Sequence, residues 1–490
     1  MKKKSLKINA LFSVIKTIMS LIFPLITFPY ASRILLPEGI GKVNFANSII
    51  SYFGIIASLG ISTYGIREAS KIKNDKQQLS KFVIELFIIN LISTIVSYAI
   101  LYACIICIPK LQEYRLLLFI CSLSIFFTTL GLEWIYNTFE EYGYITIRSF
   151  VFQIISIILL FLLVKTTNDY TKYACIIVIS SVGSNICNFI NARKFIDIRN
   201  IRKIEIKKHI KPILIFFGST LAISVFTILD TSMLGFLSTE TEVGYYTAAT
   251  KLIRMIRDLF PAIFTVLFAR LSSYANDVKE ANNYTDIINN TINFILCFSI
   301  PIIVGLLLLG KNIIEILSGI SYIKALPTMY IMTPVILFSS LAGFLGGNIL
   351  LSKGKEKIYL LCVIIGAFIN FLLNFLLIPK KGALGAGIST VITEFLLMTV
   401  YICLLKNSLD FKSFIIPIIQ YVCSSMFMGG ILYIIQRYIK SYVLQIIIMP
   451  IIGFILYISL LILTKNNFIN NIFQMIFSKI NKIISIKTKV

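Results

Sequence analysis

Histidine, tryptophan and acidic residues are scarce in this chain of 490 residues. There is one histidine, His209, and Asp and Glu together number 22 against 46 Lys and Arg. A Ser-His-Asp triad needs a histidine beside its nucleophile, and His209 lies in a strongly basic stretch. No pair of carboxylates is spaced for acid–base catalysis. The sequence therefore predicts that the chain is not an enzyme.

Paired metal ligands and soluble domains are also absent from the sequence pattern. The nine cysteines are scattered through apolar segments. Cys104 and Cys107 form one CxxC, but no second pair stands at a spacing typical of zinc sites. We therefore expect no metal and no cofactor. No polar stretch is long enough for a folded external domain, which argues against a membrane glycosyltransferase or polymerase.

Apolar residues dominate what is present. They make up 57% of the chain, and the mean hydropathy is +0.89. Apolar segments long enough to cross about 30 Å of hydrocarbon recur along nearly the whole length. The fold class predicted is an all-α integral membrane protein with about 14 transmembrane helices. The expected spans are 8–30, 43–65, 81–106, 114–136, 144–164, 172–192, 212–237, 244–270, 287–309, 326–350, 358–378, 384–405, 413–435 and 443–464.

The net charge of +24 comes from basic residues in short segments between these spans. No contiguous basic domain or base-stacking module is visible, so we expect no nucleic acid partner. If both termini are cytoplasmic, the inner segments carry most of the Lys and Arg, with 193–211 the densest. The basic tail after 464 would then lie on anionic membrane lipids. The predicted location is the plasma membrane, with many passes and both termini cytoplasmic.

A faint internal repeat divides the chain. The sequence EGIGKVNFAN from Glu38 aligns with TEVGYYTAAT from Thr241, and both follow a short turn after a span. Parallel repeats of this kind place a transport site between two halves. The predicted organisation is an N-terminal lobe (1–192), a basic cytoplasmic linker (193–211), a C-terminal lobe (212–405), an extra helix pair (406–464) and a basic cytoplasmic tail (465–490).

Charged residues inside the apolar segments are candidates for function. At about 1.5 Å per residue, Asp230 and Lys251 both lie about 10 Å from the turn that joins their helices. Arg254 and Arg257 follow Lys251 at three-residue spacing along one flank. Such residues are costly in lipid unless they face water or each other. Asp230 and Lys251 are therefore either a structural ion pair or part of a cationic cavity for an anion.

Other charged and kinking residues extend this set. Lys16 and Arg33 join the predicted cationic cavity, and Glu394 joins Asp230 as a charge-pairing or ion-coupling residue. Glu85 and Glu133 lie nearer a membrane surface, where long side chains can reach water. Prolines permit helix bends, and the predicted hinges are Pro24, Pro29 and Pro261.

Several motifs carry a resemblance to a known family. They are FPYASRILLPEGIGKVNFA from Phe28, LGISTYGIRE from Leu59, LDTSMLG from Leu229, EVGYYTAATK from Glu242 and GALGAG from Gly382. Over nearly its whole length the chain resembles bacterial polysaccharide flippases of the Wzx type, in the multidrug/oligosaccharidyl-lipid/polysaccharide superfamily that includes the MATE transporters. Where that family has a basic residue after the aspartate of the LDTSMLG motif, this chain has Thr231.

The resemblance implies two pseudo-symmetric six-helix lobes and a substrate. The implied activity is movement of undecaprenyl-pyrophosphate-linked oligosaccharide from the inner to the outer leaflet, for capsule, O-antigen or exopolysaccharide synthesis. The cavity cations would meet the pyrophosphate, Na⁺ or H⁺ would be the coupling ion, and other membrane proteins of polysaccharide assembly would be partners. A cation-coupled multidrug exporter of the same fold is the alternative, although such a protein would favour acidic residues in its cavity.

Overall fold

The computed structural model describes residues 6–197, 204–261, 264, 267, 271, 281–406, 409, 412–471 and 473–474. Within these ranges the chain is almost entirely helical and contains no strand, which confirms the all-α prediction. By length and composition, eight described helices can cross a membrane, or nine if one bent pair counts as a span. Part of the predicted linker (198–203), most of the predicted eighth span after 261 and most of the tail (475–490) lie outside the described residues.

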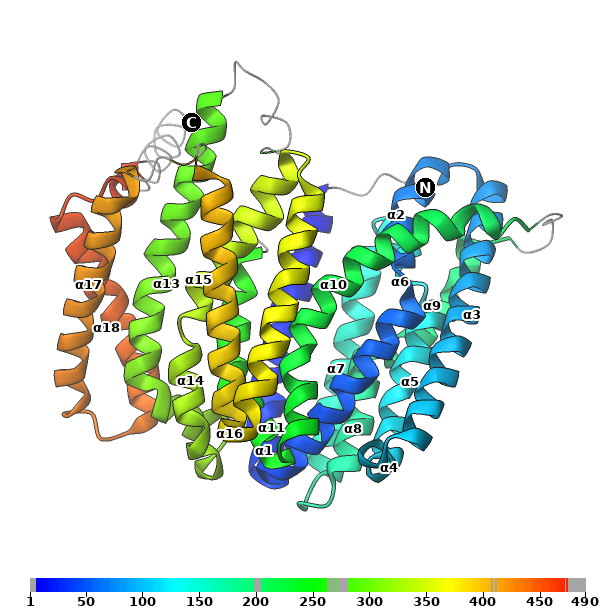
Figure 1. Cartoon of the computed structure of the whole chain (residues 1–490), viewed down its shortest axis with the longest axis horizontal. Coiled ribbons are helices and arrows are strands. Elements are labelled where there is room, and N and C mark those ends of the chain that lie inside the picture. Colours follow the sequence, from blue (N-terminus) through cyan, green and yellow to red (C-terminus); the bar gives the residue numbers. More distant parts are fainter. Residues whose placement is uncertain are drawn as a thin grey trace, which may run out of the picture. The chain divides into compact units, whose positions relative to one another are not determined.

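The described helices follow the apolar segments closely. In chain order they are α1 (Leu6–Ser58), α2 (Ile61–Ile72), α3 (Lys76–Cys107), α4 (Pro109–Glu113), α5 (Arg115–Gly131), α6 (Glu133–Thr138), α7 (Tyr142–Leu163), α8 (Tyr170–Val178), α9 (Asn185–Asn191), α10 (Lys207–Leu237), α11 (Glu240–Arg257), α13 (Ala281–Leu317), α14 (Leu326–Met332), α15 (Val335–Phe344), α16 (Glu356–Leu404), α17 (Lys412–Gln436) and α18 (Tyr442–Leu463). Figure 1 shows them coloured along the sequence.

Two compact units make up the chain. The first comprises Met1–Thr247, Leu317–Tyr322 and Asn370–Ala386, and the second comprises Ala248–Ile316, Ile323–Ile369 and Gly387–Val490. These units follow internal contacts and do not test the predicted lobe boundaries, which stay a prediction.

Two long helices, α1 and α16, break between two predicted spans, at Leu36 and Gly382, and two other predicted spans are interrupted within their length. Leu36 has φ 59° and ψ 175°, so α1 breaks there into two arms, whereas the helix continues through Pro24 and Pro29. Leu132, with φ 44°, separates α5 from α6 inside the expected span 114–136. A π-helical turn, Ile179–Gly183, joins α8 to α9. Gly382, with φ 53°, breaks α16.

Many large apolar side chains on these helices are exposed. In α3, Ile92 and Ile95 are 52% and 61% exposed, and in α18 the values for Ile451 and Phe454 are 57% and 59%. Rows of exposed apolar residues on long helices are costly in water and favourable against lipid tails. The chain is a multi-pass membrane protein.

The first turn of α10 is fixed by a buried polar cluster. His209, 4% exposed, contacts Glu85 through Nε2 and Tyr64 through Nδ1, both at 2.8 Å. Lys208 lies 3.3 Å from the same carboxylate. Glu85 is only 1% exposed, so the expectation that it reaches water is wrong, and His209 lies in a helix rather than a loop. Lys81 lies 3.8 Å from the other oxygen of Glu85. A carboxylate with these partners can be buried because its charge is compensated.

In the second unit, the extra helix pair packs on α13. Tyr457 of α18 donates a hydrogen bond to the carbonyl oxygen of Cys297 at 2.8 Å. Tyr421 of α17 donates to Oδ1 of Asn293 at 3.2 Å. The chain therefore continues past the twelfth predicted span with a helical pair, as the sequence predicts.

Candidate functional site

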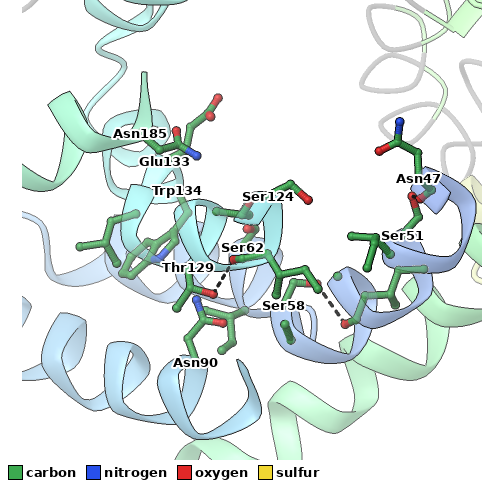
Figure 2. Close-up of a pocket in the computed structure, with 18 residues that line it drawn as sticks. Asn47, Ser51, Ser58, Ser62, Asn90, Ser124, Thr129, Glu133, Trp134 and Asn185 are labelled. Atoms are coloured by element: carbon green, nitrogen blue, oxygen red, sulfur yellow. Dashed lines mark hydrogen bonds between the residues drawn. The ribbon is translucent and has the colours of Figure 1, made fainter. Parts of the chain in front are cut away.

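A polar pocket of about 370 Å³ lies within the first unit, between the second arm of α1 and helices α2, α3, α5, α6 and α9. In Figure 2, Asn47 and Ser51 stand on one side of this pocket, and Glu133, Trp134 and Asn185 on the other. Its lining residues are Asn47, Ile50, Ser51, Gly54, Ile55, Ala57, Ser58, Ile61, Ser62, Asn90, Ser124, Ile125, Thr128, Thr129, Leu132, Glu133, Trp134 and Asn185. A hollow with this many amides and hydroxyls is unusual among apolar helices and is therefore a candidate binding site.

The positions of these residues follow from local helix geometry. Asn47, Ser51 and Ser58 lie four and seven residues apart, so they share one face of the second arm of α1. Glu133 and Trp134 reach the pocket because the left-handed Leu132 restarts the helix there. This pocket was not predicted from the sequence. The spacing of polar residues at 47, 51 and 58 was the signal that could have found it.

One end of the pocket carries compensated charge. Glu133 accepts a hydrogen bond from Lys16 at 2.7 Å, and the buried Arg148 lies 3.4 Å from its other oxygen. Arg148 also donates to the carbonyl oxygen of Ser184 at 2.8 Å and to Oδ1 of Asn185 at 3.2 Å. Lys16 was predicted as a cavity cation. The structure gives it a carboxylate partner that itself lines the pocket.

Asp230 is the centre of a second buried polar cluster. It is 5% exposed, and it accepts hydrogen bonds from Tyr246 at 2.5 Å and from Asn374 at 2.8 Å. Asn374 also donates to Oδ1 of Asn370 at 3.0 Å. Sequence analysis missed these three partners. The predicted pairing of Asp230 with Lys251 stays a prediction.

The remaining predicted site residues have different environments. Lys251 and Arg254 are partly buried on α11, whereas Arg257 forms an ion pair with Asp258 at 2.8 Å. Because Asp258 compensates Arg257, the predicted cationic flank is weaker at that end. Glu394 is buried in α16. Arg33 is exposed on α1 and lies against Gly319, and Pro261 is exposed.

A tight backbone contact lies at the turn between α10 and α11, and we call it the glycine junction: Pro37, Gly41, Glu240 and Gly244. A Cβ on Gly41 would overlap the carbonyl oxygen of Glu240, and one on Gly244 would overlap that of Pro37. The same Gly41 Cβ would stand 3.1 Å from the nitrogen of Gly244. Gly41 and Gly244 are equivalent in the internal repeat, so the two copies meet reciprocally at this point.

Ionic contacts surround the glycine junction. Glu240 accepts from Lys110 at 2.9 Å and also from the Tyr114 hydroxyl. Burial alone would raise the pKa of Glu240, but the bonds from Tyr114 and Lys110 outweigh it and lower that pKa to about 2. Glu242 accepts from the backbone N–H of Ala383 at 2.7 Å. In Figure 1, α4, the break of α1 and the start of α11 lie at the same end of the first unit.

Comparison with known proteins places this geometry in context. A protein of Shigella dysenteriae named "Putative O-antigen transporter" is 26% identical over 391 residues, which are 77% of this chain and 94% of that protein. A protein of the same name from Escherichia coli strain K12 is 23% identical over 423 residues, 83% of this chain and 98% of its own length. The structure of the lipid II flippase MurJ, in an inward closed conformation, covers 94% of this chain with a TM-score of 0.62 and 19% identity.

The likeness to MurJ shows a shared fold, in agreement with the predicted MATE-like architecture. Both relatives, which match over most of their length, are named as putative transporters. The model of one family, described as polysaccharide biosynthesis protein, matches residues 6–275. That range is more than half of the chain and includes both the polar pocket and the glycine junction. This chain belongs to the polysaccharide biosynthesis protein family.

Proposed function

We propose that this chain is a flippase that moves lipid-linked oligosaccharide across the bacterial plasma membrane, from the inner to the outer leaflet, for surface polysaccharide synthesis. The observation that carries the proposal is a polar hollow inside a membrane-embedded unit, in a chain that aligns with O-antigen transporters over nearly their full length. A sugar–pyrophosphate headgroup cannot cross hydrocarbon unaided, but its polyprenyl tail can stay in lipid. A polar path for the headgroup alone is therefore sufficient to move the whole lipid-linked oligosaccharide between the leaflets.

The partly buried cations of α11 are proposed to bind the pyrophosphate. A guanidinium presents paired donors that match phosphate oxygens, so Arg254 suits this role better than a lysine would. The cationic excess of this flank argues against the alternative, a cation-coupled multidrug exporter, which would need acidic groups to attract its cargo.

The direct test is reconstitution of the purified protein in liposomes with a fluorescent undecaprenyl-pyrophosphate-linked oligosaccharide. Translocation is measured by exposure of the sugar to an impermeant quencher. We expect movement above that in protein-free liposomes, its loss in Arg254→Ala, and partial recovery in Arg254→Lys. If the sugar moves no faster than in empty liposomes while ethidium is exported, the multidrug alternative replaces the proposal.

We propose Asp230 as the residue that binds a coupling ion, Na⁺ or H⁺. The carboxylate is buried, and the buried Oδ1 of its neighbour Asn374 accepts no hydrogen bond from the described residues. Oxygen ligands of this kind suit Na⁺, and H⁺ is the alternative coupling ion. Translocation in sodium and in choline buffers over a pH series, for wild type and Asp230→Asn, tests this. If the variant keeps the ion dependence of the wild type, Asp230 does not bind the coupling ion.

The orientation is also a proposal: both termini and segment 193–211 are cytoplasmic because basic residues gather there. A cysteine introduced at Lys203 in a cysteine-free background should resist impermeant maleimides in intact cells. Labelling without permeabilisation would reverse the orientation. Co-purification from the native membrane tests whether other polysaccharide-assembly proteins are partners.

A further inference from the structure

The hydrogen-bonding character of the pocket in the first unit identifies a class of ligand. Ser51, Ser58 and Ser124 donate their hydroxyl hydrogens to carbonyl groups of their own helices, at 2.7, 3.1 and 2.6 Å. A hydroxyl that has used its hydrogen retains lone pairs that can accept. These three side chains therefore present acceptors to a ligand.

Two further acceptors lie in the same lining. The buried Oδ1 of Asn90 accepts no hydrogen bond in the part of the chain that the structure describes. An unsatisfied buried acceptor costs about 1–3 kcal/mol, so a donor from a ligand would be stabilising once the Asn90 side chain turned its oxygen toward the pocket. The Glu133 carboxylate, an acceptor-only group, closes one end. Its charge is compensated by Lys16 and Arg148, so the pocket does not attract a cation strongly.

An acceptor-rich lining selects ligands that donate. Phosphate and pyrophosphate are anionic and present mainly acceptors. They could accept from the amides of Asn47 and Asn185 in this lining, but they would also face the Glu133 carboxylate, whereas a ligand that donates as well as accepts can use both kinds of group. The hydroxyl groups of a sugar each donate one hydrogen bond and can also accept. The lining therefore favours the sugar part of a lipid-linked oligosaccharide over its pyrophosphate.

The size of the pocket agrees with this ligand. Its volume of about 370 Å³ falls in the range of small-molecule sites, about 300–1,000 Å³. A bare metal ion needs a far smaller and more charged cage. Among the described residues, no group of three or more His, Cys, Asp or Glu could hold one.

We propose that this pocket binds one sugar residue of the oligosaccharide while the pyrophosphate is bound elsewhere. The proposal rests on the proposed function and makes it more specific. The sugar would place hydroxyl donors on Asn90, on Glu133 and on the serine oxygens of the second arm of α1. The pocket would then contribute to the choice of oligosaccharide, whereas cations on α11 would bind any lipid pyrophosphate.

The chain contains its own reporter for the test. Trp134 is the one tryptophan of the 490 residues, and it lines the pocket. Tryptophan emission of the purified protein in detergent micelles, which contain no other protein, therefore comes from this one position in the lining. The probes are the free oligosaccharide cleaved from the lipid carrier of the organism that makes this chain, sodium pyrophosphate, and sodium chloride at matched sodium concentration.

We expect a saturable change in emission with the oligosaccharide and none with pyrophosphate or sodium chloride. Asn90→Leu should raise the Kd for the oligosaccharide at least tenfold, and Ser62→Ala, which alters an exposed lining serine, should raise it less. Asn44→Leu is the control, because Asn44 lies on α1 outside the lining. If Asn90→Leu does not fold, Ser62→Ala and Thr128→Val decide the result.

Three results would overturn the proposal: a response to sodium or pyrophosphate without one to the oligosaccharide, no response to any probe, or unchanged affinity in every folded lining variant. Translocation in liposomes is measured on the same preparations. If translocation occurs without sugar-dependent emission, the sugar-binding role of the pocket is wrong and the proposed flippase function still holds. If emission responds but no lipid-linked sugar moves, the proposed function fails instead.

Discussion

The second arm of α1 is built differently at its two ends. Its first turns, around Gly41, pack backbone against backbone in the glycine junction, where a single methyl group does not fit. Its later turns, from Asn47 to Ser58, border a hollow of about 370 Å³. Gly41 and Ser51 are ten residues apart, about 15 Å along one helix. One helical arm therefore connects a tight contact to an open polar pocket, so the two ends can be tested separately by substitution.

The largest expected effect comes from breaking the tight end. Gly41→Ala or Gly244→Ala would place a Cβ on a carbonyl oxygen, and overpacking of this kind costs about 1–3 kcal/mol, occasionally more. We expect a lower melting temperature and loss of translocation. Gly218→Ala in α10 is the matched control, because a Cβ there meets nothing within 4 Å. Melting of Gly41→Ala at the wild-type temperature would show that the glycine junction is loose.

The next effect is expected at the open end. Glu133→Gln leaves the guanidinium of Arg148, with a side chain only 6% exposed, without its carboxylate. We expect a smaller loss of stability than at the glycine junction, because Glu133 is partly exposed and Arg148 keeps its bonds to Ser184 and Asn185. The folded yield should fall more in Glu133→Gln than in Lys16→Met, which removes the exposed partner. Equal yields would mean that Arg148 is satisfied by Ser184 and Asn185 alone.

A smaller effect is expected from protonating Glu240 at the glycine junction, and it can be measured as the melting temperature over a pH series. The pKa of Glu240 is lowered to about 2 in the folded protein, and this residue lies in the turn outside the predicted spans. A carboxyl with a lowered pKa stabilises the fold above its unfolded pKa, and the stabilisation is lost as pH falls through the folded value. Wild type should melt above Glu240→Gln at pH 7, by an amount that shrinks between about pH 4.5 and 2. A constant difference would contradict the assignment.

The smallest expected effect on folding concerns the first arm of α1. The helix continues through Pro24 and Pro29 and breaks at Leu36. If these prolines are hinges, Pro24→Ala or Pro29→Ala should slow translocation and leave the melting temperature nearly unchanged. Unchanged translocation in both variants would make them static kinks and leave Leu36 as the bend of this helix.

Hydropathy predicted the helices well because membrane spans are set by local composition. The expected span 443–464 and the observed α18, Tyr442–Leu463, differ by one residue at each end. The pocket was not predicted, since its serines and asparagines come from five segments that only the fold brings together. The partners of Glu85 and Asp230 were missed for the same reason. Sequence spacing finds neighbours on one helix, but His209 and Glu85 are 124 positions apart.

The reciprocal contact of Gly41 with Gly244 also bears on how such a chain could have arisen. If the two halves descend from one duplicated segment, its ancestor would have met a second copy of itself at this same glycine. A single glycine in the ancestor would then have supplied both sides of the contact. After fusion, the sequence of each repeat could diverge at every position except the one that still contacts the other repeat. The two glycines would be a surviving trace of a symmetric dimer inside one polypeptide.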